Sequence, residues 1–308
     1  MPLPIQIPSL AELLALAPLR VEVLDIGASA EGEPRYQRLL DLKLCRVTGF
    51  EPQPKQLAKL RSESAAAGGS HIWLGHVLGD GEKATFHAAR YPSCSSLLPP
   101  DPASIDIFTG MNASHEGGNF TITGTETVTT RRLDDLAECP PPDFARVSQQ
   151  GNELNVLRHG LEKLQDAVVL ECEVAFLPLY KNQPLFGDID RALRKAGWVL
   201  HRFMDIAGRS FRPIRLPNPS QAISQVLWAD AVFVKDFRRL DKLSEDQVNK
   251  AALVLHEVYG SYDLVSLLLG EIDRRHRSDL AIRYRQALAA LAARNELPIQ
   301  FLSVKNRL

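Results

Sequence analysis

Short apolar runs alternate with amphipathic segments through the first quarter of the chain, and this alternation constrains the fold more than any other feature. The apolar runs at Val21–Ile26, Arg46–Phe50 and His71–Trp73 are typical of buried strands. The segments between them, Pro34–Leu42 and Pro54–Ala67, have the apolar spacing of helices. A β-α-β-α-β order of this kind predicts a parallel sheet that is covered by helices.

The middle of the chain follows a different pattern. "KATFHAARY" and "ETVTTRRL" alternate as antiparallel strands do, and they bracket the polar, Gly-rich stretch 110–124. Strand and helix then alternate again. The expected elements are a strand in "DFARVS", a helix in "GNELNVLRHGLEKL", a buried strand in "AVVLECEV", a helix in "FGDIDRALRKAG", and an antiparallel pair in "WVLHRFMDI" and "SQVLWADAVFVKD".

These patterns predict an α/β fold with a doubly wound, mostly parallel seven-stranded sheet and one antiparallel edge pair. A short helix at Ser9–Ala17 precedes the sheet, and the pattern is helical from Leu243 onward, with breaks near Gly260 and Pro298. We expect one Rossmann-like domain over 1–240, with an inserted β segment and loop at 84–131, and a helical extension over 241–308.

Charge and cysteine usage exclude several classes of function. The 308 residues carry a net charge of -1, which argues against a general nucleic-acid binder. The four cysteines have no C-x-x-C spacing and the eight histidines no ligand spacing, so neither a metal site nor a disulfide framework is expected. This cysteine usage favours the reducing cytoplasm, and the apolar stretch near the N-terminus is not typical of a signal peptide or a membrane span. The basic stretch 274–308 is either a solvated helix face or a contact for an anionic partner.

The turn after the first strand has the composition of a ligand site. Asp25 ends the strand, and small residues follow from Gly27 to Gly32. Open parallel sheets bind ligands beyond the carboxyl ends of their strands, where small residues let a ligand approach the backbone. The spacing fails the G-x-G-x-x-G pattern of dinucleotide sites. Because a carboxylate repels pyrophosphate, Asp25 favours a ligand with cationic groups, such as S-adenosylmethionine.

A second acidic residue, Glu51, ends the second strand within "GFEP". A carboxylate there can accept hydrogen bonds from both hydroxyls of a ribose, each worth about 1.5–3 kcal/mol when charge-assisted. The alternative is that Glu51 caps the helix that begins near Pro54.

In order and spacing, several further segments resemble the FkbM-type S-adenosylmethionine-dependent methyltransferases over most of residues 20–236. The matching pieces are "LDIGA", "GFEP", "HVLGDGEKATFH", "SCSSLLPP", "TTRRLDDL", "ARVSQQGNELNVLRHG", "EVAFLPLYKNQPLF" and "LWADAVFVKD". The run "CSSLLPP" is the most specific of them. The resemblance implies a class I methyltransferase fold with S-adenosyl-L-methionine as the cofactor.

The resemblance also implies roles for individual residues. It implies cofactor contacts from Asp25, Gly27, Ala28, Ser29, Gly32, Glu51, Pro52, His76, Val77 and Ser148, and substrate-side positions at Ser95, Ser96 and Tyr180. It places Glu153 and Glu173 as acidic residues at the mouth of the pocket. Some of these positions have plainer readings: His76 as a surface residue, Ser95 and Ser96 as a turn, and Glu153 as a carboxylate favoured at a helix N-terminus.

The Gly-rich stretch 110–124 contains few large apolar residues, so little burial offsets the entropy of ordering it. We expect a mobile substrate-side lid with His115 and Glu116 on its pocket face. A surface hairpin without a role is the alternative.

Two departures from the family pattern affect the expected chemistry. Ser29 replaces an asparagine, and the second glycine of the turn falls one residue late, at Gly32. Ser148 stands where the family usually has an aspartate, beside the transferred methyl group. Since a hydroxyl cannot act as a carboxylate base, Glu153 and Glu173 become the candidate catalytic bases.

The resulting hypothesis is an O-methyltransferase that acts on a hydroxyl of a sugar or secondary metabolite. The alternatives are a cofactor-binding protein with weak or no catalysis, which Ser148 favours, or an N-methyltransferase. The expected partner is a small-molecule or glycan hydroxyl acceptor. No nucleic acid, metal or membrane span is expected, and a homodimer is left open.

Overall fold

The computed structural model describes residues 7–15, 17, 19–27, 33–66, 71–218, 221–294 and 297. These residues form two compact units. The sheet unit comprises the described residues of Val21–Pro34 and Cys45–Asp236, and the helical unit comprises those of Met1–Arg20, Arg35–Leu44 and Phe237–Leu308. The residues of the predicted extension thus group with two segments from the N-terminal part of the chain.

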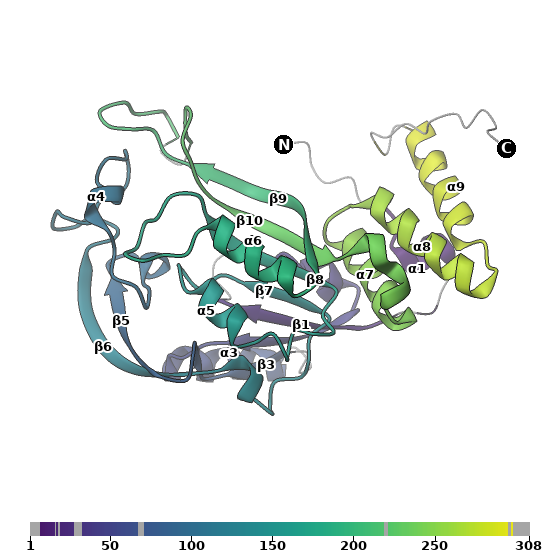
Figure 1. Ribbon diagram of the computed structural model, residues 1–308, viewed down its shortest axis with the longest axis horizontal. Helices are drawn as coiled ribbons and strands as arrows, with labels where there is room; N and C mark the ends of the chain where they lie inside the picture. Colours follow the sequence, from purple (N-terminus) through teal and green to yellow (C-terminus); the bar gives the residue numbers. More distant parts are fainter. Residues whose placement is uncertain are drawn as a thin grey trace. The chain divides into compact units, whose positions relative to one another are not determined.

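A seven-stranded sheet forms the centre of the sheet unit (Figure 1). Its strands are β1 (Val21–Ile26), β2 (Cys45–Phe50), β3 (His71–Leu74), β7 (Phe144–Val147), β8 (Val169–Ala175), β9 (Trp198–Gly208) and β10 (Val226–Lys235). They lie in the order β3-β2-β1-β7-β8-β10-β9. The first five are parallel, while β10 runs antiparallel to both β8 and the edge strand β9. The predicted fold class, including the antiparallel pair at the edge, is confirmed.

The strand order reverses between β1 and β7. From β1 the chain proceeds outward through β2 to β3, and it returns to the other side of β1 with β7. In an open α/β sheet, this switch point at the carboxyl ends of the strands is where ligands bind. The turn after Ile26 and the residues after Val147 both lie there.

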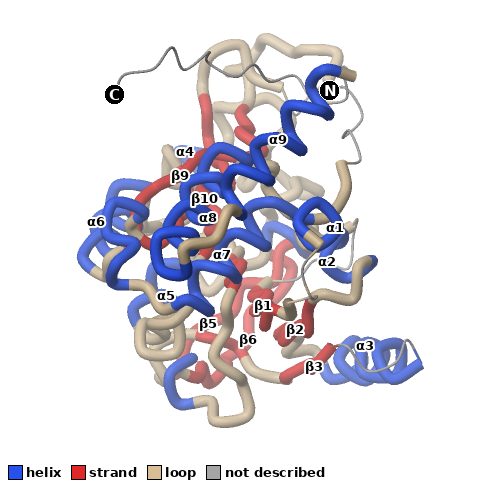
Figure 2. The backbone as a smooth tube through the Cα atoms, turned by 90° about the vertical axis from the view of Figure 1, so that its right-hand side faces the viewer, coloured by secondary structure: helices blue, strands red, loops and turns tan. Residues whose placement is uncertain are grey.

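Alternation along the strands separates an apolar face from a face that carries charge. On one face, Leu24, Ala145 and Leu170 form a core with Leu157 of α5 (Glu153–Arg158) and Ile189 of α6 (Phe186–Lys195). On the other face, Asp25, Arg146 and Glu171 are register partners across β1, β7 and β8. Helix α3 (Pro54–Ala66) contacts the edge strand β3 (Figure 2). The prediction for α5 was too long, because turns follow its last helical residue, Arg158.

The inserted segment forms a second, three-stranded sheet. Strand β5 (Lys83–Ala89) pairs antiparallel with β6 (Ile122–Arg131), as predicted, and β4 (Val77–Leu78) pairs parallel with β6. The 3-10 helices η1 (Pro92–Cys94) and η2 (Leu133–Asp135) and the helix α4 (Pro102–Ile105) complete this region. A separate core holds it together and contains Ile105, Phe108, Met111, Phe120, Leu179, Tyr180 and Leu227.

The helical unit contains α1 (Leu10–Leu14), α2 (Gln37–Asp41), η3 (Phe237–Lys242), α7 (Glu245–Glu257), α8 (Tyr262–His276) and α9 (Leu280–Ala293). The break predicted near Gly260 separates α7 from α8. A second break follows α8, where Arg277 adopts a left-handed conformation with φ 55°. The break predicted near Pro298 lies outside the described residues.

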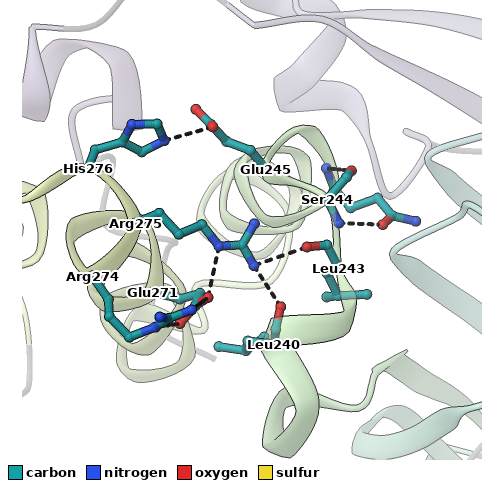
Figure 3. A network of polar contacts seen from close by, with 9 residues as sticks. Leu240, Leu243, Ser244, Glu245, Glu271, Arg274, Arg275 and His276 are labelled. Carbon is teal, nitrogen blue, oxygen red and sulfur yellow. Dashed lines mark hydrogen bonds and ion pairs between the residues drawn. The ribbon is translucent and has the colours of Figure 1, made fainter.

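Polar contacts connect the segment before α7 with α8 (Figure 3). The Arg275 guanidinium donates to the carbonyl oxygens of Leu240 (2.7 Å) and Leu243 (3.0 Å) and to the Glu271 carboxylate (2.8 Å). Arg274 pairs with the same carboxylate at 2.7 Å. These two arginines of the basic stretch therefore serve contacts within the helical unit. None of the helices in the described part of the chain is long and apolar enough to cross a membrane.

Candidate functional site

The turn after β1 packs directly against the end of β7. Gly27 has φ +85°, and a Cβ atom added there would lie 1.6 Å from the carbonyl oxygen of Ser148. The Ser148 amide donates to the Ile26 carbonyl at 2.8 Å, which continues the pairing of the two strands. Only glycine combines this backbone conformation with so close an approach. The remaining predicted cofactor residues of this turn, Ala28, Ser29 and Gly32, lie outside the described residues.

A row of charged side chains crosses the sheet just before the switch point. Arg146 Nε donates to Glu171 Oε1 at 3.0 Å, and Arg146 Nη1 lies 3.5 Å from Asp25 Oδ1. Asp25 is 2% exposed and Glu171 is also buried. Burial acts to lower the pKa of Arg146, but the carboxylates of Asp25, Glu171 and Asp230 outweigh this effect and hold the pKa above its ordinary value. The guanidinium therefore stays charged and orients Asp25 beneath the turn.

Glu173 is a half-buried carboxylate beside the switch point. It contacts Ser148, the residue that stands where the family usually has an aspartate. Ser148 Oγ donates to Glu173 Oε2 at 2.8 Å, and Gln150 Nε2 lies 3.2 Å from Glu173 Oε1. Asp230 of β10 is its register partner. Burial raises the pKa of Glu173 and Asp230 raises it further, although the hydrogen bond from Ser148 acts in the opposite direction.

Glu153 is buried under the loop that follows β7. Its Oε1 accepts from the backbone amides of Gln149 (2.9 Å) and Gly151 (3.1 Å). The loop needs this support, because Gln150 and Gly151 have φ +46° and +92°. Burial, followed by the proximity of Glu173, raises the pKa of Glu153 to about 8. Glu153 thus shapes the loop that presents Gln150 to Glu173.

The same loop is fastened to two predicted substrate-side residues. Ser96 Oγ donates to the Gln150 carbonyl at 2.6 Å, and Tyr180 Oη donates to Gln150 Oε1 at 3.2 Å. Both side chains are buried. Ser95 Oγ accepts from the Ala89 amide at 3.0 Å. Gln150 therefore connects Ser96 and Tyr180 with Glu173 and completes a group at the ends of β7 and β8.

The predicted adenosine contacts lie on the neighbouring strands. Asp25 is in register with Gly49 of β2, and Glu51 follows the last residue of that strand, Phe50. Glu51 Oε1 accepts from the Gln53 amide at 2.8 Å, and the half-buried carboxylate thus helps to start α3 just after Pro52. His76 follows β3, with its Nε2 2.9 Å from Glu138 Oε1, and Val77 begins β4.

His115 is exposed on the loop 110–124. Its amide donates to Asn112 Oδ1 at 2.9 Å, and its carbonyl accepts from Thr121 Oγ1 at 2.7 Å. Glu116 and its neighbours line a small hollow beside Tyr91. The loop is anchored at both ends, because Met111 and Phe120 are buried in the second core.

Sequence reasoning missed Arg146, Glu171, Gln150 and Asp230. A signal existed for the first two, since each is a charged residue inside an otherwise apolar strand. Unpaired charges are expelled from a core, so charged residues on adjacent buried strands imply a partner or a site. Gln150 gave no such signal, because its role depends on the left-handed turn at residues 150–151.

The charged groups at the switch point suit the expected cofactor, S-adenosyl-L-methionine. Carboxylates outnumber the single guanidinium at the switch point, where Asp25, Glu171, Glu173 and Asp230 surround Arg146. Such a site favours a ligand with cationic ammonium and sulfonium groups. Glu51 provides the carboxylate for a ribose, and Gly27 clears space at the backbone. Among the described residues, no group of three His, Cys, Asp or Glu is placed to hold a metal ion.

A family model described as "Methyltransferase FkbM domain" matches residues 25–200 of the chain. No curated protein matches. Two similar solved structures are a precorrin-6y C5,15-methyltransferase from Geobacter metallireducens and a magnesium protoporphyrin IX methyltransferase from Synechocystis PCC 6803. The first is 14% identical with a TM-score of 0.34, over 74% of this chain and 86% of that one. The second is 13% identical with a TM-score of 0.36, over 74% and 76%.

Proposed function

The chain belongs to the FkbM methyltransferase family, and we propose that it methylates a hydroxyl group of a sugar or a secondary metabolite. As a member of this family it is a methyltransferase that depends on S-adenosyl-L-methionine.

The contact between Ser148 and Glu173 carries the proposal. Ser148 occupies the position where a carboxylate is usual, and its hydroxyl donates to a carboxylate on the next strand at 2.8 Å. Glu173 therefore places a carboxylate base in direct contact with the residue that replaces the usual aspartate. Its raised pKa suits this role, because a base whose pKa approaches the working pH accepts a proton most effectively.

The other residues would hold the two reactants in place. When bound, S-adenosylmethionine supplies an electrophilic methyl group on a sulfonium. Glu51 would accept hydrogen bonds from the ribose hydroxyls, while Asp25, held by Arg146, would face the cationic end. Glu173 would take the proton of the acceptor hydroxyl, and Ser148 and Gln150 would orient its carboxylate. Alignment of two reactants can contribute up to roughly 7–11 kcal/mol to such a transfer.

Glu153 has a supporting role in this scheme. Its Oε1 is held by two backbone amides, and its side chain is buried, so it positions Gln150 through the loop. Ser96 and Tyr180 support the same loop from the substrate side.

Binding without catalysis is the second candidate function, and the hydroxyl at Ser148 is the observation that favours it. Calorimetric titration with S-adenosylhomocysteine, followed by transfer of labelled methyl groups to sugars, phenols and amines, separates the possibilities. We expect binding, with label appearing on hydroxyl acceptors. Label on amines alone would contradict the hydroxyl assignment, and binding with no transfer to any acceptor would support the second function.

A further inference from the structure

The connection between β9 and β10 combines exposed apolar side chains with arginines. It extends beyond the ends of β9 and β10, on the side of the sheet unit where α4 lies (Figure 1). Its exposed large apolar residues are Phe211, Ile214 and Ile223. The connection, residues 209–225, contains three arginines, Arg209, Arg212 and Arg215, and no acidic residue, while the exposed Asp205 precedes it in β9. This segment therefore presents apolar surface within a net positive charge.

The tip of this hairpin is fixed against the loop that follows α4. The Arg212 amide donates to the Ile107 carbonyl at 2.9 Å, and the Thr109 amide donates to the Ser210 carbonyl at 2.8 Å. The rings of Phe108 and Phe211 lie 4.9 Å apart. These contacts bring Ile107, which is also exposed, to the same surface. We call Ile107, Phe211, Ile214 and Ile223, with the three arginines, the hairpin patch.

The hydrogen bonds of Arg212 do not neutralise its positive charge. The Arg212 guanidinium donates to the carbonyl oxygens of Phe108 (3.0 Å) and Met111 (2.6 Å), which are neutral partners. Arg209 lies over the Trp228 ring at 4.9 Å, and Arg215 is exposed. Nearby, Asp106 accepts from the Ala113 amide at 2.6 Å and so faces into its own loop.

The hairpin begins at the edge of the sheet that carries the candidate site. Because β10 is antiparallel to β8, its first residues lie at the carboxyl end of β8, where Trp228 is in register with Ala175. The Phe176 amide donates to the Leu227 carbonyl at 2.8 Å, only three residues after Glu173. A surface that binds the hairpin patch therefore meets the protein at the edge where an acceptor must enter.

We propose that the hairpin patch docks the protein on an anionic lipid membrane. Large exposed apolar groups mark interaction surfaces, and aliphatic and aromatic side chains flanked by arginines are suited to the headgroup region of a bilayer. The apolar side chains insert among the lipids, and the arginines lie beside lipid phosphates. In consequence, and resting on the proposed function, the acceptor hydroxyl belongs to a molecule held at the membrane surface.

The test is co-sedimentation of the full chain with vesicles. One set contains phosphatidylcholine alone, and the other contains equal parts of phosphatidylcholine and phosphatidylglycerol. We expect binding to the anionic vesicles that weakens with salt. Each arginine near an anionic surface strengthens binding about fivefold, so Arg215→Ser should weaken it by that factor. The double variant Ile214→Ser, Ile223→Ser should weaken it about tenfold or more.

Matched controls distinguish the effect of substitutions in the hairpin patch from the effect of substituting any exposed residue of the same kind. Ile214 and Ile223 are 55% and 64% exposed, and Leu267 and Ile282 in the helical unit are 50% and 52% exposed. The double variant Leu267→Ser, Ile282→Ser and the variant Arg191→Ser, whose arginine is exposed on α6, should bind vesicles as the parent protein does.

Three results would each overturn the proposal. They are equal binding to neutral and anionic vesicles, no binding to either, and equal loss in the patch and control variants. A dimer that the patch substitutions dissociate, together with no vesicle binding, would assign the patch to a second copy of the chain and also overturn it. Binding of S-adenosylhomocysteine is measured in parallel. If it persists while vesicle binding fails, only the docking is disproved.

Discussion

At the scale of single residues, the proposed chemistry depends on Glu173. Glu173→Gln keeps the size of the side chain and an oxygen that can accept from Ser148, but it cannot accept a proton at neutral pH. We expect methyl transfer to fall about 10²–10⁴-fold, with unchanged affinity for S-adenosylhomocysteine. Because the pKa of Glu173 is raised, the parent activity should rise with pH through an ionisation above the ordinary glutamate range. Initial rates across pH measure both effects.

Two outcomes would contradict this role. Glu162→Gln, at an exposed position in the turns after α5, serves as the matched control and should leave activity unchanged. An equal fall in both variants would indicate general destabilisation. A Glu173→Gln protein with full activity would show that the acceptor needs no base at this position.

The ribose contact is a separate property of Glu51. Glu51→Ala should weaken binding of S-adenosylmethionine by about 1.5–3 kcal/mol, roughly ten- to a hundredfold, because a charge-assisted hydrogen bond to the ribose is lost. The carboxylate also accepts from the Gln53 amide, so Glu51→Gln, which keeps an accepting oxygen, is the control for that contact. Calorimetry gives the affinities. Unchanged affinity in both variants would mean that Glu51 only stabilises the turn before α3 and does not bind the ribose.

The residues of the site were predictable to different degrees, for physical reasons. Gly27 follows from the local pattern, since a small turn after a buried strand anticipates a close backbone approach. Ser148 and Glu173 were each identified through the resemblance, but not their contact, because they lie 25 residues apart and meet only when β7 pairs with β8. The position of the Gln150 side chain depends on a left-handed turn at residues 150–151, and no sequence pattern there predicts that turn.

At the scale of elements, the loop 110–124 remains a predicted lid with a definite geometry. Met111 and Phe120 are buried, and the Asn112 amide donates to Asn119 Oδ1 at 2.9 Å, so the base of the loop is closed. Movement should therefore concentrate at residues 114–117, which are exposed. We expect acceptor to increase amide protection there, while Phe120 stays protected throughout.

Hydrogen exchange with and without saturating acceptor measures this protection, and β6 serves as an internal reference. If protection of residues 110–124 is the same in both states, the loop is a surface hairpin and not a lid.

The predicted elements agree best where the apolar period is strong. The strands β1, β2, β8, β9 and β10 lie close to the predicted ranges, because each is an apolar or alternating run with polar residues beside it. Helix α2 begins at Gln37, three residues after the predicted start at Pro34, and it has no side-chain cap hydrogen bond. The break at Arg277 was missed, since an arginine in a left-handed conformation gives no sequence signal.

At the scale of the whole molecule, the fold class was predictable and the composition of the units was not. The alternation of strands and helices along the chain follows from local patterns, and this alternation predicts a parallel sheet. The helical unit depends on contacts across great separations in sequence. Glu257 accepts from the Leu10 amide at 2.7 Å and from Arg38 Nε at 2.6 Å, although 247 and 219 residues separate these partners. Such long-range pairing of a buried charge leaves no periodic trace in the sequence.

The stability of the whole chain should depend on pH through Glu153. Burial raises its pKa from the ordinary value of 4.5 to about 8, so over this range the folded chain holds a proton that the unfolded chain releases. The contribution of Glu153 to stability is therefore fully present below pH 4.5 and is lost as pH rises to about 8.

Glu153→Gln keeps an oxygen for the amides of Gln149 and Gly151 and cannot ionise. Relative to this variant, the parent should lose up to about 4 kcal/mol of unfolding free energy across the range. Denaturant titrations of both proteins at several pH values measure the difference. Parallel curves for parent and variant would mean that Glu153 is ionised in the folded chain at neutral pH, and that the loop around Gln150 is built on a charged carboxylate.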